Sequence, residues 1–261
     1  METVTGLAAA IIARDEEQHL DGCLASLVGL ADEVLVLLDD RTRDASAAIA
    51  TARGARVVTA AWQGYPAQHN LALRLCRQPW VLFVDADERV TPELASAIRA
   101  LLATTPSADG YWLPRYNLFF GQTLRGGGWY PDHQLRLLRR EVAHYDEARL
   151  VHEYAEVPGP TAYLHAHLLH HNIDRLGELW AKQSGYALAE ARTLYRAGRR
   201  ARARNLFGAP AREFWRRYIS LGGWRDGGLG LFLSATMAWH EVVKFVFLFG
   251  LEAGGSHPAH K

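Results

Sequence analysis

The sequence predicts an α/β fold in the N-terminal part of the chain, followed by a helical extension. Short apolar runs of strand length alternate with helix-like segments, a pattern typical of βαβ units and a mostly parallel sheet. Two of these runs end abruptly in aspartates, one at 39 and 40 and the other at 85 and 87. Open α/β sheets bind their ligands at the carboxyl ends of the strands, so we expect a ligand site there.

The apolar runs are each short enough to form a single strand. We expect strands over 7–13, 33–38, 56–60 and 80–84. The segments between them predict helices over about 16–30, from a cap among 42–46 to about 52, and around 70–73. Right-handed crossovers between such strands give a sheet that is flanked by helices.

The fourth apolar run carries the strongest functional signal. It is rich in aromatic and β-branched residues, which favours a buried strand, and it ends at Asp85, Asp87 and Glu88. Asp85 and Asp87 are separated by one residue, so an extended backbone aims both carboxylates the same way. Paired oxygen ligands suit a hard divalent cation that carries a diphosphate. Aspartates also cap helices, and a helix signal follows at 91–93, so this pair alone leaves both interpretations open.

The second apolar run also ends in acids, Asp39 and Asp40. A carboxylate there can accept hydrogen bonds from a base or a ribose. Capping of the next helix is the alternative, although Asp44 or Ser46 can supply that cap instead. No Gly-x-Gly-x-x-Gly follows the first strand and no Walker lysine motif occurs, so a diphosphate at this edge needs a metal.

Composition and charge exclude several classes of protein. The 261 residues are 49% hydrophobic and 22% charged, as in ordinary globular proteins, and a net charge of +1 gives no field for nucleic acid. The cysteines, Cys23 and Cys76, show no metal spacing and no disulfide framework, which favours a reducing compartment. The first residues lack the positive start of a signal peptide, so we expect a cytoplasmic location.

Several blocks resemble the signature blocks of family 2 glycosyltransferases of GT-A fold. They lie at 11–17, 34–44 and 83–88. The chain is more similar to the bacterial subgroup that includes lipopolysaccharide core glucosyltransferases, through a Gln-x-Asn helix at 68–70 and later blocks at 127–137 and 151–153. His170 also matches a histidine often found in that subgroup. The blocks cover roughly residues 7–175 in order, with two departures: Asp15 stands where asparagine is more frequent, and Arg41 and Arg43 where serine or glycine is usual.

This resemblance implies a catalytic GT-A domain over 1–172 and an activity. The activity is inverting transfer of a sugar from a nucleotide-sugar donor to a hydroxyl of a cell-envelope glycan or a lipid-linked acceptor. Asp132, beside the aromatic residues of the 127–137 block, matches the family's general base. Asp85 and Asp87 are expected to hold Mg²⁺ or Mn²⁺. The expected donor-binding residues are Asp39, Asp40, Asp44, Gln68, Asn70, Asp85, Arg136, His152 and Glu153.

The helical extension, 173–261, combines a basic and an apolar segment. Arginines crowd 192–217, and 229–251 is apolar and aromatic. His240, Glu241 and Lys244 in its middle argue against a membrane-spanning helix. We expect this extension to lie on the anionic inner leaflet, which would make the protein peripheral to the inner membrane. A solvated arginine face beside a buried helix, or beside a homodimer interface, is the alternative.

Two other functions remain open at this stage. A nucleotidyltransferase that acts on sugar phosphates also uses an α/β domain and acidic metal ligands, but it would want a basic glycine-rich loop where this chain has the acidic residues 15–17. A membrane-peripheral scaffold without catalysis is the second alternative. The presence of Asp85, Asp87 and Asp132 speaks against a scaffold.

Overall fold

The computed structural model describes residues 6–148 and 154–254, which form two compact units. The first unit contains the chain up to residue 116 together with 132–171, and the second contains 117–131 and the residues from 172 onward. The segment 117–131 therefore belongs to the second unit, although the residues on both sides of it belong to the first. The division at 172/173 that the sequence suggests for the two domains stays a prediction.

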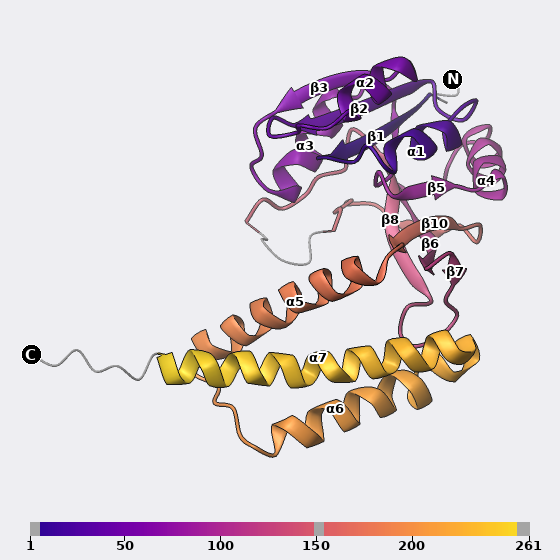
Figure 1. The fold of residues 1–261 in the computed structure, drawn as a ribbon. Coiled ribbons are helices and arrows are strands. Elements are labelled where there is room, and N and C mark those ends of the chain that lie inside the picture. Colours follow the sequence, from indigo (N-terminus) through magenta and orange to yellow (C-terminus); the bar gives the residue numbers. More distant parts are fainter. Residues whose placement is uncertain (1–5, 149–153, 255–261) are drawn as a thin grey trace, which may run out of the picture. The chain divides into compact units, whose positions relative to one another are not determined.

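The first unit is built on a mixed sheet (Figure 1). Its strands are β1 (Leu7–Ala13), β2 (Glu33–Asp39), β3 (Arg56–Ala60), β4 (Trp80–Phe83), β5 (Glu88–Val90), β6 (Gly110–Phe119), β8 (Asp132–Arg139), β9 (Thr161–Tyr163) and β10 (Leu168–Ile173), with β7 (Gln122–Thr123) in the second unit. The main path runs β3-β2-β1-β4-β8-β6-β10-β5, with β7 and β9 paired to β6. The pairs among β3, β2, β1 and β4 are parallel, whereas β8 joins β4 and β6 antiparallel.

The central strand β1 shows why these runs fold as strands. Its residues are almost all buried, and they alternate between the two faces of the sheet. Leu7, Ala9 and Ile11 join a core with the helices α1 (Leu20–Ser26), α2 (Ser46–Ala52) and α4 (Pro92–Leu102). Ala8 and Ala10 join a second core with α3 (Tyr65–Leu75). Burial on both faces explains the uninterrupted apolar runs in the sequence.

The predicted α/β fold with a helical C-terminal extension is confirmed. The four expected strands lie within one residue of their predicted ends. The first helix is shorter than expected and begins only at Leu20. Asp15 takes a positive φ of 53° just after β1, which starts a turn instead of a helix. Gly29, with φ 72°, lies in the turn beyond the other end.

The second unit consists mainly of helices. These are α5 (Leu176–Arg196), α6 (Asn205–Trp215), the π-helical turn η1 (Arg216–Ser220), the 3₁₀ turn η2 (Gly223–Asp226) and α7 (Gly227–Gly254). In Figure 1, α7 runs between α5 and α6 and packs along both. The core of the second unit contains Phe119, Leu124 and Ile173, packed with Leu179 and Leu233 of the helices. By length and composition alone, the helical stretch Gly223–Ala253 is able to cross a membrane, and a third of its most apolar window is buried.

The glycine-rich segment 126–128 is attached to the turns of the second unit. Backbone N–H groups of Arg125 and Gly126 donate to the carboxylate of Asp226 at 2.7 and 2.9 Å. The N–H of Gly127 donates to the carbonyl of Leu221 at 2.9 Å. A Cβ on Gly126 would lie 2.1 Å from the carbonyl oxygen of Gly222, so only glycine permits this close approach.

Candidate active site

The acidic end of β4 does not cap the helix that follows it. The hydroxyl of Thr91 caps α4 by accepting from the N–H of Leu94 at 3.1 Å. Asp85 and Asp87 therefore need another explanation, and the capping alternative that the sequence left open is removed for this pair. Both carboxylates have other partners, which lie on β6, β8 and β10.

Arg136 of β8 holds the carboxylate of Asp85. Its Nη1 donates to Oδ1 at 3.1 Å and its Nη2 donates to Oδ2. Burial opposes the charge of Arg136, but the carboxylates of Asp85 and Glu88 outweigh it and hold the pKa of Arg136 above its usual range. Burial likewise opposes the charge of Asp85, yet Arg136 keeps the pKa of this carboxyl low. Arg136, an expected donor-binding residue, thus lies at the acidic strand end, where its charge is already paired.

Arg115 of β6 joins three carboxylates and was not among the residues expected from the sequence. Its Nη1 donates to Glu88 at 2.9 Å, and its Nε and Nη2 donate to Oδ2 of Asp132 at 2.9 and 2.7 Å. It also lies 3.8 Å from the carboxylate of Asp85. Antiparallel pairing of β6 with β8 sets Arg115 opposite Asp132, which explains the meeting of residues far apart in the chain.

Asp132, the predicted general base, lies at the first residue of β8. The amide of Gln134 donates to its Oδ1 at 2.7 Å, while Arg115 occupies Oδ2. Gln134 is two residues further along the same strand, so both side chains point to the same face. The carboxylate of Asp132 is therefore fixed in orientation from two sides and remains about a quarter exposed.

Asp87 lies beside His170 of β10. The Nε2 atom of His170 is 3.2 Å from Oδ2 of Asp87, and the backbone N–H of His171 donates to the carbonyl of Asp87 at 2.9 Å. A carboxylate and an imidazole are both ligands for divalent first-row metals. No group of three or more His, Cys, Asp or Glu side chains within 6–148 and 154–254 is arranged to hold a metal. Two protein ligands are nevertheless enough for Mg²⁺, which usually keeps waters and substrate phosphates in its shell.

Glu16 lies near these acids, and their negative charges contribute to a raised pKa of its carboxyl. Burial raises the pKa of Glu16 to about 7, assisted by the negative charges of Asp87, Asp44 and Asp85. The backbone N–H of Glu16 donates to the hydroxyl of Ser46 at 2.9 Å, which fixes the turn after β1. The turn after β1 thus adds a further carboxylate to the field of the strand-end aspartates.

Two of the acids at and after the end of β2 already accept hydrogen bonds from neighbouring groups. Arg41 forms a bidentate pair with the buried carboxylate of Asp39, and this hydrogen bonding holds the pKa of Asp39 well below its usual range. Asp44 accepts from the backbone N–H groups of Glu17 and Ser46 at 2.8 and 3.0 Å, whereas Asp40 is exposed. The departure at Arg41 therefore has a consequence, because the carboxylate expected to contact the nucleotide is already paired.

The second departure, Asp15, is explained by its backbone. At φ 53° it adopts the left-handed conformation that asparagine and aspartate tolerate best among residues with side chains. Its Oδ1 accepts from the backbone N–H of Arg43 at 2.7 Å. Asparagine has the same oxygen at the same place, so either residue can join the two loops.

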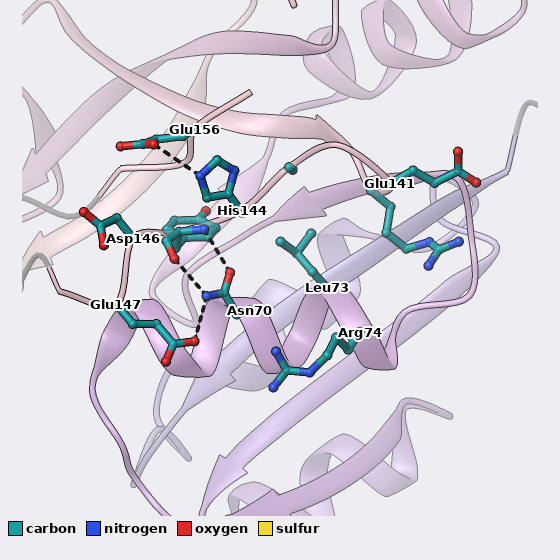
Figure 2. Close-up of a pocket in the computed structure, with 11 residues that line it drawn as sticks. Asn70, Leu73, Arg74, Glu141, His144, Asp146, Glu147 and Glu156 are labelled. Carbon is teal, nitrogen blue, oxygen red and sulfur yellow. Dashed lines mark hydrogen bonds and ion pairs between the residues drawn. The ribbon is translucent and has the colours of Figure 1, made fainter. Parts of the chain in front are cut away.

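The Gln-x-Asn helix, α3, is hydrogen-bonded to two other segments of the chain, one at Ala61 and one at Tyr145. Gln68 is buried, and its amide donates to the carbonyl of Ala61 at 2.6 Å. Asn70 pairs with both backbone groups of Tyr145, donating at 2.8 Å and accepting at 2.9 Å, and it also donates to Glu147 (Figure 2). These contacts give Gln68 and Asn70 a structural role, and their contact with a donor stays a prediction.

A shallow pocket of about 670 Å³ opens beside Asn70 (Figure 2). Figure 2 shows His144 turned toward Glu156, 3.3 Å from its carboxylate, and Arg74 extending from α3 below Asn70. The strand-end residues Asp85, Asp87 and Asp132 do not line this pocket. The pocket is therefore a different feature from the acidic cluster.

Two predicted donor-binding residues, His152 and Glu153, lie outside the described residues. Of the residues that the sequence did not single out for the site, Arg115 and Glu88 carry the most contacts. Glu88 was visible as the third carboxylate after β4. Arg115 gave no local signal, because a lone arginine in a strand is common and its partners are distant in sequence.

The chain is similar in sequence to a known family and to known proteins. A family model described as glycosyl transferase family 2 matches residues 9–148. The chain is 30% identical over 243 residues to the lipopolysaccharide core biosynthesis glycosyltransferase LpsC of Rhizobium meliloti (strain 1021), covering 89% of this chain and 87% of that protein. It is 37% identical over 98 residues to the uncharacterized glycosyltransferase RC0292 of Rickettsia conorii, covering 38% of this chain and 34% of that one.

Two solved structures are also similar in part. One is glucosyl-3-phosphoglycerate synthase from Mycobacterium tuberculosis in complex with Mn²⁺, UDP and glucosyl-3-phosphoglycerate, with TM-score 0.44, 19% identity, and coverage of 74% of this chain and 80% of that one. The other is S. aureus TarS 1–349 with UDP, with TM-score 0.46, 15% identity, and coverage of 70% and 64%. The family model spans more than half of this chain and LpsC aligns over most of it, so the chain belongs to family 2 of the glycosyltransferases.

Proposed function

We propose that this protein is an inverting, metal-dependent glycosyltransferase that acts on a lipopolysaccharide-core or lipid-linked acceptor. The donor is a nucleoside-diphosphate sugar. The observation that carries the proposal is the position of Asp132, whose carboxylate is fixed by Arg115, in one network with Asp85 at the end of β4. A base and an acidic strand end are the two groups that one-step displacement of a diphosphate requires.

In the proposed reaction, Asp132 accepts the proton of the acceptor hydroxyl. The acceptor oxygen forms its bond to the anomeric carbon as the bond from that carbon to the diphosphate oxygen breaks, so the nucleoside diphosphate leaves and the configuration inverts. Arg115 and Gln134 hold the carboxylate of Asp132 in one orientation, which reduces the ordering that the transition state requires.

The residues beside Asp87 fit a divalent cation. Asp87 and His170 would hold Mg²⁺ or Mn²⁺, with Asp85 nearby, and the bound cation would neutralise charge on the leaving diphosphate. Arg136 contributes by holding Asp85 in place, and its positive charge adds to the local potential for phosphate. The exposed Asp40 is the acid at the end of β2 that is best placed for a donor hydroxyl.

The acceptor class rests on the relative that covers most of this chain. LpsC is described as a lipopolysaccharide core biosynthesis glycosyltransferase. We therefore propose that the acceptor is a sugar hydroxyl of a lipopolysaccharide core or of a similar lipid-linked glycan. The sugar and the base of the donor are determined by pocket shape.

The metal assignment is tested by diphosphate binding, without an acceptor. UDP, GDP and ADP are titrated into the native protein with and without Mn²⁺. The nucleotide that binds is then titrated into the Asp87→Asn and His170→Gln variants in the same way. We expect the gain in affinity that Mn²⁺ gives to fall about a hundredfold in either variant, because a metal ligand is lost. Glu93→Gln, an exposed acid on α4, is the control and should bind as the native protein does. Equal affinity with and without Mn²⁺ in the native protein would exclude the metal.

The alternatives are tested by the products. A glycosyltransferase slowly hydrolyses its nucleotide sugar to free sugar and nucleoside diphosphate. A nucleotidyltransferase instead forms a nucleotide sugar from a sugar phosphate and a nucleoside triphosphate, with release of pyrophosphate. A scaffold does neither, and its Asp132→Asn variant would be indistinguishable from the native protein in both assays.

A further inference from the structure

The helix formed by α6 and η1 exposes a row of apolar side chains. Phe207 is 77% exposed, Trp215 is 62% exposed and Ile219 is 41% exposed, and the exposed Ala211 lies between the first two. The four residues follow one another at intervals of four, which places them along one face of the helix. Large side chains rarely stay this exposed in a row unless another surface covers them.

A basic row runs beside the apolar one. Arg212 and Arg216 each follow a residue of the apolar row by one position, Arg204 precedes Phe207 by three, and all three arginines are exposed. Nine arginines and a single acid, Glu213, lie between residues 192 and 217. Glu213 is already paired with Arg216 and Arg217. Within the part of the chain that the structure describes, no ion pair involves Arg204 or Arg212.

The adjoining turn and α7 also expose apolar side chains. Trp224 in η2 is 55% exposed, and the guanidinium of Arg225 lies 5.5 Å from the centroid of its ring. On α7, Leu231 is 46% exposed, Trp239 is 54% exposed and Val246 is 54% exposed. The charged residues of α7 are turned elsewhere, since Lys244 pairs with Glu190 of α5 at 3.1 Å. The outer face of α7 is therefore apolar.

We propose that the α6–η1–η2 surface, with the exposed face of α7, docks on an anionic lipid bilayer. Charge complementarity selects this occupant. A row of arginines matches a sheet of lipid phosphates, while the adjacent phenylalanine and tryptophans enter the interface between headgroups and acyl chains. The inner-membrane location expected from the sequence stays a prediction.

The proposal concerns the second unit alone and does not depend on the proposed function. Lipid binding is measured without donor or acceptor, so its failure leaves the glycosyltransferase chemistry unaffected. The full chain is sedimented with phosphatidylcholine vesicles, with and without about a third of phosphatidylglycerol, at low and high salt. We expect binding to the anionic vesicles that high salt weakens without abolishing it.

Two pairs of variants separate the apolar row from the basic row. Phe207→Ser with Trp215→Ser should lower the partition coefficient about tenfold or more, with salt dependence retained. Arg204→Gln with Arg212→Gln should lower it about tenfold or more on anionic vesicles only. These side chains are exposed, so the melting temperature should not change. Tyr186→Ser, on α5 and 55% exposed, is the control for the first pair. Arg74→Gln with Arg77→Gln, both exposed on the first unit, is the control for the second.

Three outcomes would overturn the proposal. The first is no binding to anionic vesicles, and the second is equal binding to neutral and anionic ones. The third is a dimer, seen by light scattering, that the Phe207→Ser and Trp215→Ser pair dissociates while the native protein ignores vesicles. In that case the apolar row is an interface between two copies of the chain.

Discussion

Glu88 and Arg115 form a buried ion pair, in which Nη1 of Arg115 donates to Oε1 of Glu88 at 2.9 Å. Glu88 is fully buried, and its second oxygen accepts from the backbone N–H of Asp85 at 2.9 Å. Arg136 lies 3.5 Å from the same carboxylate. Glu88 thus sits between the two arginines that hold Asp132 and Asp85, and it positions both without facing solvent itself.

Glu88→Gln should therefore destabilise the protein and slow turnover together. Loss of the buried charge leaves two guanidiniums under-compensated, which costs roughly 3 kcal/mol or more of unfolding free energy. Turnover should fall because Arg115 no longer fixes Asp132. Urea denaturation and steady-state kinetics measure the two effects, with Glu93→Gln as the matched exposed control. Native-like unfolding and turnover would show that Glu88 is already uncharged in the folded protein.

Asp132→Asn should separate catalysis from binding. The amide keeps the size of the side chain and removes the proton acceptor, so turnover should fall roughly a hundredfold or more with donor affinity nearly unchanged. Donor affinity is measured by titration and turnover by release of nucleoside diphosphate. If turnover is retained and donor affinity is lost, Asp132 is a donor ligand and the base lies elsewhere.

Much of the fold was predictable because its central strands are buried on both faces. β1 and β2 give continuous apolar runs, and the aspartates after β2 and β4 mark the ligand edge directly. The antiparallel strands were harder to predict, since β6 and β8 contain charged residues that face the site. Arg115 and Arg136 on these strands meet Asp85 only through pairing across the sheet.

The local sequence also did not predict features that depend on the backbone conformation of one residue or on the partner of a side chain. The late start of α1 depends on the positive φ of Asp15, which no apolar periodicity reveals. The pairing of Asp39 with Arg41 depends on a turn that brings residues two apart into bidentate contact. The roles of Gln68 and Asn70 in attaching loops depend on segments that are up to 77 residues away.

His69 should make the first unit less stable in mild acid. Burial lowers the pKa of His69 to about 4 from a usual value of 6.5, so the unfolded chain takes up a proton at a higher pH than the folded one. Stability is therefore complete above pH 6.5 and is lost as the pH falls from 6.5 toward 4, by roughly 3 kcal/mol at most. His69→Phe keeps a ring stacked on Tyr145 and should flatten this part of the curve. The unfolding free energy is measured by urea denaturation at several pH values, and an unchanged slope in the variant would contradict the assignment.

Glu16 should have the opposite effect, measured with a chelator present so that no cation compensates the acids. Its pKa is raised to about 7 from 4.5, so the folded protein holds the proton more tightly than the unfolded chain does. The stabilisation is complete below pH 4.5 and is lost as the pH rises from 4.5 through 7. Glu16→Gln removes the charge, and it should match the native protein near pH 4.5 and be more stable at pH 8, by about 1–2 kcal/mol after allowance for solvent screening. Glu17→Gln, an exposed neighbour, is the control. The difference in unfolding free energy between the native protein and Glu16→Gln is compared at pH 4.5 and pH 8. An equal difference at both pH values would show that Glu16 is ionised across this range.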